Sequence, residues 1–282
     1  MNLNDLRDTP PWDWPETAAK RIHQVLVDRG AQASERLLAA DLAGDITVIN
    51  DDLAGALLGI VRGANEPEPL RAQAAISLGP VLEYADTDGF EDLDDLTISE
   101  RTFHTIQNSL HEIYQDESLP KEVRRRILEA SVRAPLDWHA GAIRTAYSSG
   151  DREWVITAVF SMRWVRGFDD VILEAMNSPQ LEVQAEAITA AGNWELEPAW
   201  PRVVALVTDP ATPKPLLLAA IGAVAGIRPE EAPELLVDLA DSEDEEIADA
   251  ADEALSMAEE LPGEDEEYEE DEDEDEEEEE TE

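Results

Sequence analysis

A stripe of small and apolar residues recurs along the chain, and it limits the possible folds more than any other feature. The stretch EVQAEAITAAGNWE, residues 182–195, places Val183, Ala187, Ile188, Ala190 and Ala191 at positions i, i+4, i+5, i+7 and i+8. Residues with this spacing lie on one side of an α-helix. The stretch contains no Cys, His, Ser or Lys, so close packing explains its composition better than chemistry does.

The same stripe is found in register at seven places, which we call the anchors. The anchors are Ala39, Ala74, Ile127, Ala158, Ala187, Ala220 and Ala251, separated by 35, 53, 31, 29, 33 and 31 residues. A second apolar segment lies between most anchors, at 53–61, 103–113, 138–147, 171–176, 203–207 and 233–239. Each interval therefore predicts a helical hairpin, and hairpins of this kind bury their apolar faces by stacking. The sequence predicts an all-α solenoid of about six to seven hairpins.

This repeat resembles the HEAT-repeat family, in particular the short bacterial repeats named after phycobilisome lyases. The resemblance covers roughly residues 34–258 and rests on the run of seven anchors at near-constant spacing. It implies an α-solenoid whose second helices line a surface on which other proteins dock.

The chain divides into three parts on composition. Residues 1–33 form an N-terminal capping segment, in which Trp12, Trp14 and a helix over 15–29 are expected to cover the first hairpin. Residues 34–258 form the repeats, with an acidic insertion at 86–97. Residues 259–282 form a tail with 19 acidic residues and no Lys or Arg. Such a tail repels itself and buries nothing, so it is predicted to be disordered.

The charge and composition exclude several classes of protein. The net charge is −47, and the 48 acids and 20 cations outside the tail leave −28 there. Nucleic acid and anionic membranes are repelled by such a field. There is no Cys, no apolar run of membrane-spanning length and no apolar leader at the N-terminus. The chain is therefore expected to be soluble and cytoplasmic. Only three of its 20 cations are Lys, which is typical of a GC-rich bacterial genome, so we expect a bacterial protein.

Few residues form patterns that carry chemistry. His104 and His111 are seven residues apart, but no third metal ligand accompanies them. HEAT-repeat deoxyhypusine hydroxylases hold two irons with several His-Glu pairs, whereas this chain has only His111-Glu112. The insertion begins like a calcium loop, yet Thr97 stands where that loop needs Glu. We therefore expect no metal, no cofactor and no catalytic activity.

One segment differs from the rest in charge. Residues 121–166 contain nine of the 20 cations and five acids, together with three Trp. Arg and Trp dominate the energetics of protein interfaces. The alternative is that the Arg lie on solvated faces and the Trp fill the core. The candidate partner-binding residues are Arg124, Arg125, Arg126, Trp138, Arg144, Arg163, Trp164 and Arg166.

These observations predict a monomeric, non-catalytic scaffold or adaptor that binds a protein partner through the solenoid surface. Two alternatives remain open. In one, the tail acts as an acidic chaperone or decoy for basic proteins. In the other, the chain is itself an accessory lyase-like enzyme that uses the concave groove of the solenoid. The tail either covers residues 121–166 or acts outward, because local attraction and global repulsion compete within a Debye length.

Overall fold

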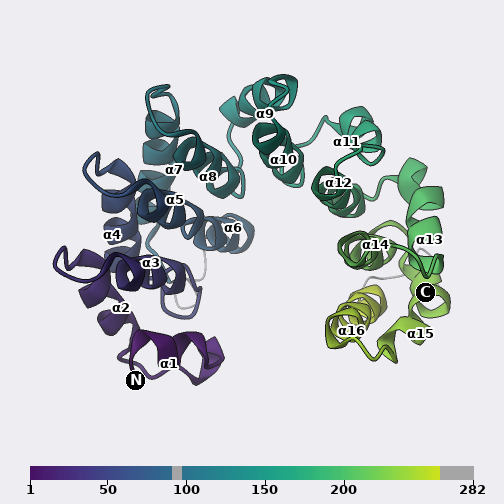
Figure 1. Ribbon diagram of the computed structural model, residues 1–282, viewed down its shortest axis with the longest axis horizontal. Coiled ribbons are helices and arrows are strands. Elements are labelled where there is room, and N and C mark those ends of the chain that lie inside the picture. Colours follow the sequence, from purple (N-terminus) through teal and green to yellow (C-terminus); the bar gives the residue numbers. More distant parts are fainter. Residues whose placement is uncertain (91–96, 261–282) are drawn as a thin grey trace, which may run out of the picture. The chain divides into compact units, whose positions relative to one another are not determined.

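The computed structural model describes residues 1–90 and 97–260, and this part of the chain contains helices and no strand. The predicted all-α fold of repeated helical hairpins is confirmed (Figure 1). The helices fall into two compact units, Met1–Ala190 and Ala191–Glu282. The predicted disordered tail, apart from Glu259 and Glu260, lies outside the described part of the chain.

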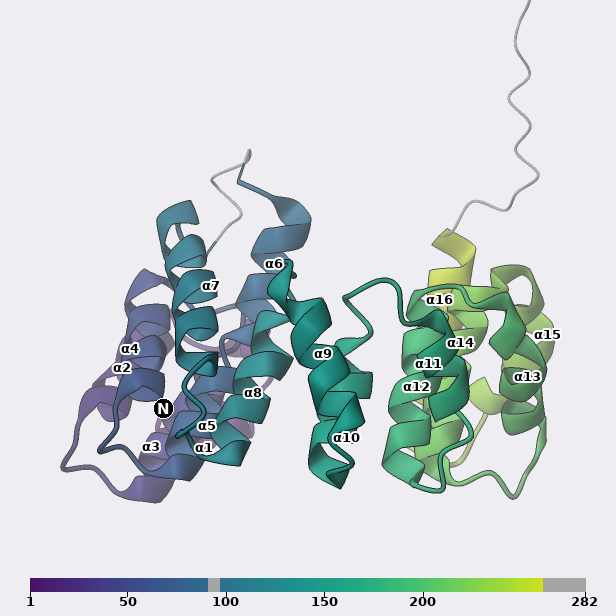
Figure 2. The same ribbon diagram turned by 90° about the horizontal axis from the view of Figure 1, so that it is seen from above.

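The first unit consists of two helical layers. Hairpins pair α2 with α3, α4 with α5, α7 with α8 and α9 with α10, and the second helices of successive hairpins also pack on one another. Figure 2 shows the first helices α2, α4 and α7 side by side, as their contacts require. The elements are α1 (Leu3–Arg7), η1 (Pro11–Asp13), α2 (Ala18–Val27), α3 (Ala33–Leu42), α4 (Asp51–Arg62), α5 (Glu68–Ile76), α6 (Gly79–Asp88), α7 (Glu100–Tyr114), α8 (Lys121–Ser131), α9 (Trp138–Ser148), α10 (Arg152–Ser161), α11 (Asp169–Ala175) and most of α12 (Leu181–Asn193).

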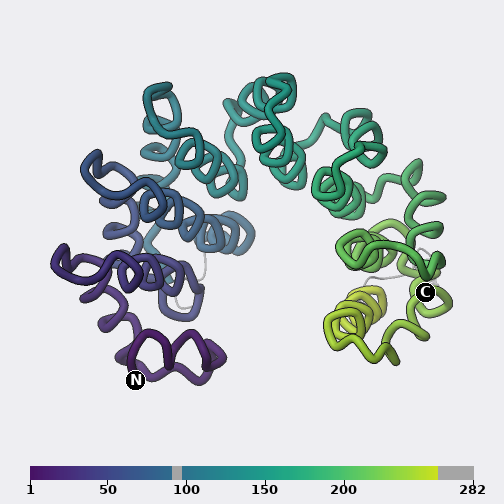
Figure 3. The backbone as a smooth tube through the Cα atoms, viewed as in Figure 1, coloured from purple at the N-terminus to yellow at the C-terminus, as the bar shows by residue number. Residues whose placement is uncertain are grey.

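The second unit continues the hairpin pattern. Its helices are η2 (Glu197–Ala199), α13 (Trp200–Thr208), α14 (Lys214–Ile227), η3 (Pro229–Glu231), α15 (Ala232–Ala240) and α16 (Glu245–Glu260), after the end of α12. Helix α14 packs on both α13 and α16, and α15 packs on α16. The tube in Figure 3 traces these hairpins one after another.

The predicted register of the repeats is correct. All seven anchors have zero exposed surface. They lie on the second helix of each hairpin, from Ala39 on α3 to Ala251 on α16. Around them, larger side chains such as Leu57, Leu82 and Leu110 are also fully buried. The stripe is therefore the seam along which successive hairpins share a core.

The same kind of ion pair joins neighbouring second helices at two places in the chain. Lys121, the first residue of α8, lies 3.0 Å from Asp151, which caps the N-terminus of α10. Lys214, the first residue of α14, lies 2.6 Å from Asp244, directly before α16. Both pairs are 30 residues apart in sequence, which is close to the repeat period. A cation at one helix start thus meets a carboxylate at the next.

One sequence expectation is wrong near the N-terminus, because of Trp12 and Trp14 only the second packs on the first hairpin. Trp14 does pack on the first hairpin and donates its Nε1–H to the carbonyls of Leu6 and Thr9, both at 2.9 Å. Trp12 is 80% exposed, because it lies in the η1 turn and faces away from the core. Helix α6 is an additional helix, since Val81, Leu82 and Ala85 bury an apolar face. The insertion thus begins within α6, and residues 91–96 lie outside the described residues.

Candidate functional site

Arg125 and Arg126 are held in a charged network within the repeat layer. Arg125 donates from Nε to Thr157 Oγ1 at 2.9 Å and from Nη1 to Glu122 Oε2 at 2.7 Å. Arg126 donates to Glu122 Oε1 at 2.8 Å and to Glu129 Oε2 at 2.7 Å. Thr157 in turn donates to Glu129 at 2.6 Å. Arg125 and Glu129 are buried, so this network fastens α8 to α10.

Arg124 belongs to a structural position that recurs in three repeats. An Arg three residues before the anchor donates its Nε–H to a backbone carbonyl ten residues earlier, at the end of the first helix of the hairpin. The pairs are Arg36 with Leu26 at 3.1 Å, Arg71 with Val61 at 3.0 Å and Arg124 with Tyr114 at 3.3 Å. The last carbonyls of a helix have no partner within the helix, so these Arg satisfy them.

Trp138 is half-buried in an aromatic stack. Its ring lies parallel to that of His111, with centroids 4.7 Å apart and an angle of 9° between the planes. Tyr114 packs against it at 5.1 Å. Its indole Nε1 is buried without a hydrogen-bond acceptor. The ring therefore joins α9 to α7 and presents no polar group to a partner.

His139, next to Trp138, is a buried neutral side chain. The Leu136 N–H donates to its Nδ1 at 2.8 Å, which leaves the proton on Nε2, 3.0 Å from Ser131 Oγ. Burial lowers the pKa of His139 to about 4. Both ring nitrogens are engaged within the fold, so His139 closes the turn before α9.

Arg163 and Trp164 lie in a second charged cluster. Arg163 pairs with Glu186 on α12. Trp164 donates to Glu83 Oε1 at 2.9 Å, and Arg133 donates to Glu83 Oε2 at 2.7 Å, with its guanidinium over the Trp164 ring at 5.1 Å. Burial raises the pKa of Glu186, and burial lowers the pKa of Arg163. This cluster links α6 and α12 to the turn after α10.

The remaining candidates lie at the surface. Arg144 is exposed on α9, with its guanidinium 5.3 Å from the centre of the Phe168 ring, and Arg166 is exposed after α10. The structure thus brings Arg125 next to Arg126 and Arg163 next to Trp164. The guanidinium groups of Arg125, Arg126 and Arg163 form ion pairs with carboxylates of the fold. Partner binding by the eight candidates stays a prediction.

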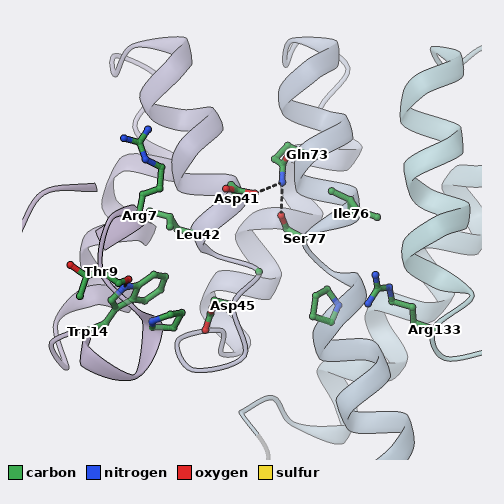
Figure 4. A pocket seen from close by; sticks show the side chains of 13 residues that line it. Arg7, Thr9, Trp14, Asp41, Leu42, Asp45, Gln73, Ile76, Ser77 and Arg133 are labelled. Atoms are coloured by element: carbon green, nitrogen blue, oxygen red, sulfur yellow. Dashed lines mark hydrogen bonds between the residues drawn. The ribbon is translucent and has the colours of Figure 1, made fainter. Parts of the chain in front are cut away.

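A pocket of about 440 Å³ opens at the N-terminal end of the first unit (Figure 4). It extends from Trp14 across the end of α3 to Arg133 beyond α8. Gln73 reaches across it and donates to Asp41 Oδ1 at 3.0 Å and to Ser77 Oγ at 3.2 Å, as the dashed lines in Figure 4 show. The lining carries guanidinium, carboxylate, amide and aromatic groups, so it offers both charged and apolar contacts.

Two further pockets adjoin the first. A pocket of about 470 Å³ shares Gln73 and Ile76 with it. The next, of about 410 Å³, shares Leu37 and Pro69 with the second. The three pockets form one row over consecutive second helices, which we call the α3–α5–α8 groove. Its lining also includes Glu68, Ala72, Glu122 and Arg126 in the middle pocket and Arg29, Ala31, Ala33, Ser34, Arg36, Pro67 and Leu70 at the far end.

Residues 1–90 and 97–260 contain no cluster of three or more His, Asp or Glu able to hold a metal ion. His104 lies 3.8 Å from Glu100, one helical turn earlier. None of the helices described here is both long and apolar enough to cross a membrane.

Comparisons with known proteins identify similar structures but no family. No protein-family model matches the chain, and no curated protein sequence matches it. Human deoxyhypusine hydroxylase in complex with glycerol is similar in structure, with 18% identity and a TM-score of 0.40 over 91% of this chain and 88% of that one. YibA of E. coli has 12% identity and a TM-score of 0.37 over 90% of this chain and 95% of its own.

The first of these comparisons corrects one expectation. We expected the chain to have no catalytic activity, and the similar human structure is that of an enzyme. Helical hairpins of this kind therefore do not exclude catalysis, and that expectation is withdrawn. The comparison concerns the fold and assigns no reaction to this chain.

The sequence predicted a docking surface lined by second helices, but it did not single out the residues of this groove. Of its eight candidate residues only Arg126 lines the groove, whose central residues are Leu37, Asp41 and Gln73 on α3 and α5. One signal was present. Leu37 lies two residues before the anchor Ala39, off the buried stripe, and it is 37% exposed. An apolar side chain off the stripe marks the face that the stacked helices leave open.

Proposed function

We propose that the chain is a scaffold or adaptor protein that binds a polypeptide segment in the α3–α5–α8 groove. The observation that carries this proposal is the row of three pockets, each sharing two lining residues with the next. Each volume, from about 410 to about 470 Å³, falls within the usual range for ligand pockets. A row of separate pockets suits a chain that offers successive side chains.

Leu37 is the main apolar contact that this groove offers to a partner. It lines both the middle pocket and the far pocket and retains 37% of its surface in water. The far pocket adds Pro67, Pro69 and Leu70 around it. Covering an exposed Leu with an apolar side chain of the partner removes that surface from water, which is the main favourable term in association.

A peptide-display selection against the full chain tests the proposal. Selected peptides should bind the wild type, and Leu37→Gln should weaken them about tenfold, as expected for the loss of one apolar anchor worth ~1.5 kcal/mol. Val237→Gln is the matched control, because Val237 is 53% exposed on α15 in the other unit. An empty selection, or equal loss of binding in both variants, contradicts the proposal.

The finer family assignment and the location in the cell are part of the same proposal. The anchors, the recurring Arg before three of them and the ion pairs 30 residues apart support membership of the HEAT-repeat family. A cytoplasmic location is part of this proposal, and the absence of Cys fits it because the chain needs no disulfide.

A further inference from the structure

The charges along the α3–α5–α8 groove are unevenly satisfied. Five Arg line its three pockets, and each has an acidic partner within the fold. The pairs are Arg7 with Asp8, Arg29 and Arg36 with Glu66, Arg126 with Glu122 and Glu129, and Arg133 with Glu83. Each of these cations thus already has a carboxylate beside it, with Arg29 and Arg36 sharing the single carboxylate of Glu66.

Three carboxylates of the same lining have no such partner. In the described part of the chain, no ion pair joins Asp41, Asp45 or Glu68 to a cation. Asp41 accepts from the neutral amide of Gln73, and Asp45 accepts from Thr47 in its own turn. Asp41 and Glu68 are exposed, and Asp45 is half-buried. The groove therefore keeps uncompensated negative charge in two of its three pockets.

Apolar surface lies beside this charge. Asp41 and Asp45 share the first pocket with Trp14, and Glu68 shares the middle pocket with Leu37 and Ile76. A ligand that matches both features carries cationic groups interspersed with apolar ones. The net charge of −28 outside the tail adds a long-range field that draws cations toward the surface.

We propose that the occupant of the α3–α5–α8 groove is a basic polypeptide segment, with Lys or Arg side chains at Asp41, Asp45 and Glu68 and an apolar side chain at Leu37. This inference rests on the proposed function and names its partner class. Complementary charges raise the association rate and suppress acidic competitors, whereas the apolar contact at Leu37 supplies most of the affinity.

The test compares two labelled peptides by fluorescence anisotropy on the full chain. One has the repeating unit Lys-Ala-Leu-Ala and the other the unit Glu-Ala-Leu-Ala. The Lys peptide should bind and the Glu peptide should not, and the affinity for the Lys peptide should fall as salt rises.

Two isosteric triple variants locate the binding site. Asp41→Asn, Asp45→Asn and Glu68→Gln keep the hydrogen-bond acceptors and remove the groove charge. Glu230→Gln, Glu234→Gln and Asp238→Asn remove the same charge from exposed positions of the second unit. The groove variant should bind the Lys peptide about tenfold more weakly, and the control should bind nearly as well as the wild type.

The outcomes separate this inference from the proposed function. If both triple variants bind the Lys peptide equally, the peptide sits on other acidic surface, such as residues 259–282, and the inference is overturned. If the Glu peptide binds as tightly as the Lys peptide and Leu37→Gln weakens both, the groove binds polypeptides without selecting basic ones, and the inference is overturned. If Leu37→Gln affects neither peptide, the proposed function itself fails.

Discussion

Two glycines on the same helix should respond in opposite ways to the same substitution. Gly222 and Gly226 lie one turn apart on α14, in the second unit. A Cβ built on Gly222 meets nothing within 4 Å. A Cβ on Gly226 meets the carbonyl oxygen of Gly192 at 2.5 Å and its carbon at 3.0 Å. The two positions share helix and unit but differ in the surface they face.

The magnitudes follow from two separate effects. Ala is favoured over Gly in a helix interior by ~1 kcal/mol, so Gly222→Ala should raise the free energy of unfolding by about 0.5–1 kcal/mol. Gly226→Ala has the same intrinsic gain, but its methyl group requires α12 and α14 to move apart. Overpacking of this kind costs ~1–3 kcal/mol, and the upper end applies because the obstructing atoms belong to backbone. The net loss should be about 2 kcal/mol.

Urea unfolding followed by far-UV circular dichroism measures both variants. The midpoint should rise for Gly222→Ala and fall for Gly226→Ala, with unchanged dependence on urea. Gly192→Ala provides a check from the opposite side of the contact, because its Cβ meets Ala223 Cα at 2.8 Å, and it should also destabilise. Equal stabilisation by Gly222→Ala and Gly226→Ala would refute the close approach of these helices.

Three other predictions concern buried polar groups. Because burial lowers the pKa of His139 to about 4, below the ordinary 6.5, the unfolded chain binds the extra proton first as pH falls. Stability should therefore drop by up to about 3 kcal/mol between pH ~6.5 and ~4, and His139→Gln should remove that part of the pH dependence in urea titrations at each pH. Arg71→Met should cost ~1–3 kcal/mol, because the carbonyl of Val61 loses two donors, whereas Arg29→Met at an 88% exposed side chain should cost less than ~0.5 kcal/mol in the same assay. In a double-mutant cycle, Arg163→Met and Glu186→Leu should each cost ~2–3 kcal/mol and together cost less than either alone, because each single change leaves a half-buried charge unpaired; additive losses would argue against the pair.

The sequence alone was sufficient for the repeats. Ala39, Ala187 and Ala251 were identified by helical spacing and proved fully buried. A stripe of small residues with a period of 3.6 packs one face of a helix closely against other helices. The position of that face depends only on the order of residues along the chain, so the sequence is enough to find it. The helices at 53–61 and 203–207 followed from the same periodicity. Helix α6 escaped detection because it has no counterpart in the other repeats.

Only the tertiary structure decided what the charged residues do. Arg125 and Arg144 look alike in the sequence, yet the first is buried between carboxylates and the second is exposed on α9. The two side chains are chemically identical, and the partner of each is determined by the hairpin that packs beside it. The groove also depends on the tertiary structure, because Leu37, Gln73 and Arg126 belong to three hairpins and come together only when their helices pack. Periodicity fixes which face of a helix is buried, but the neighbour across that face, and the surface left open beside it, depend on how the helices pack in three dimensions.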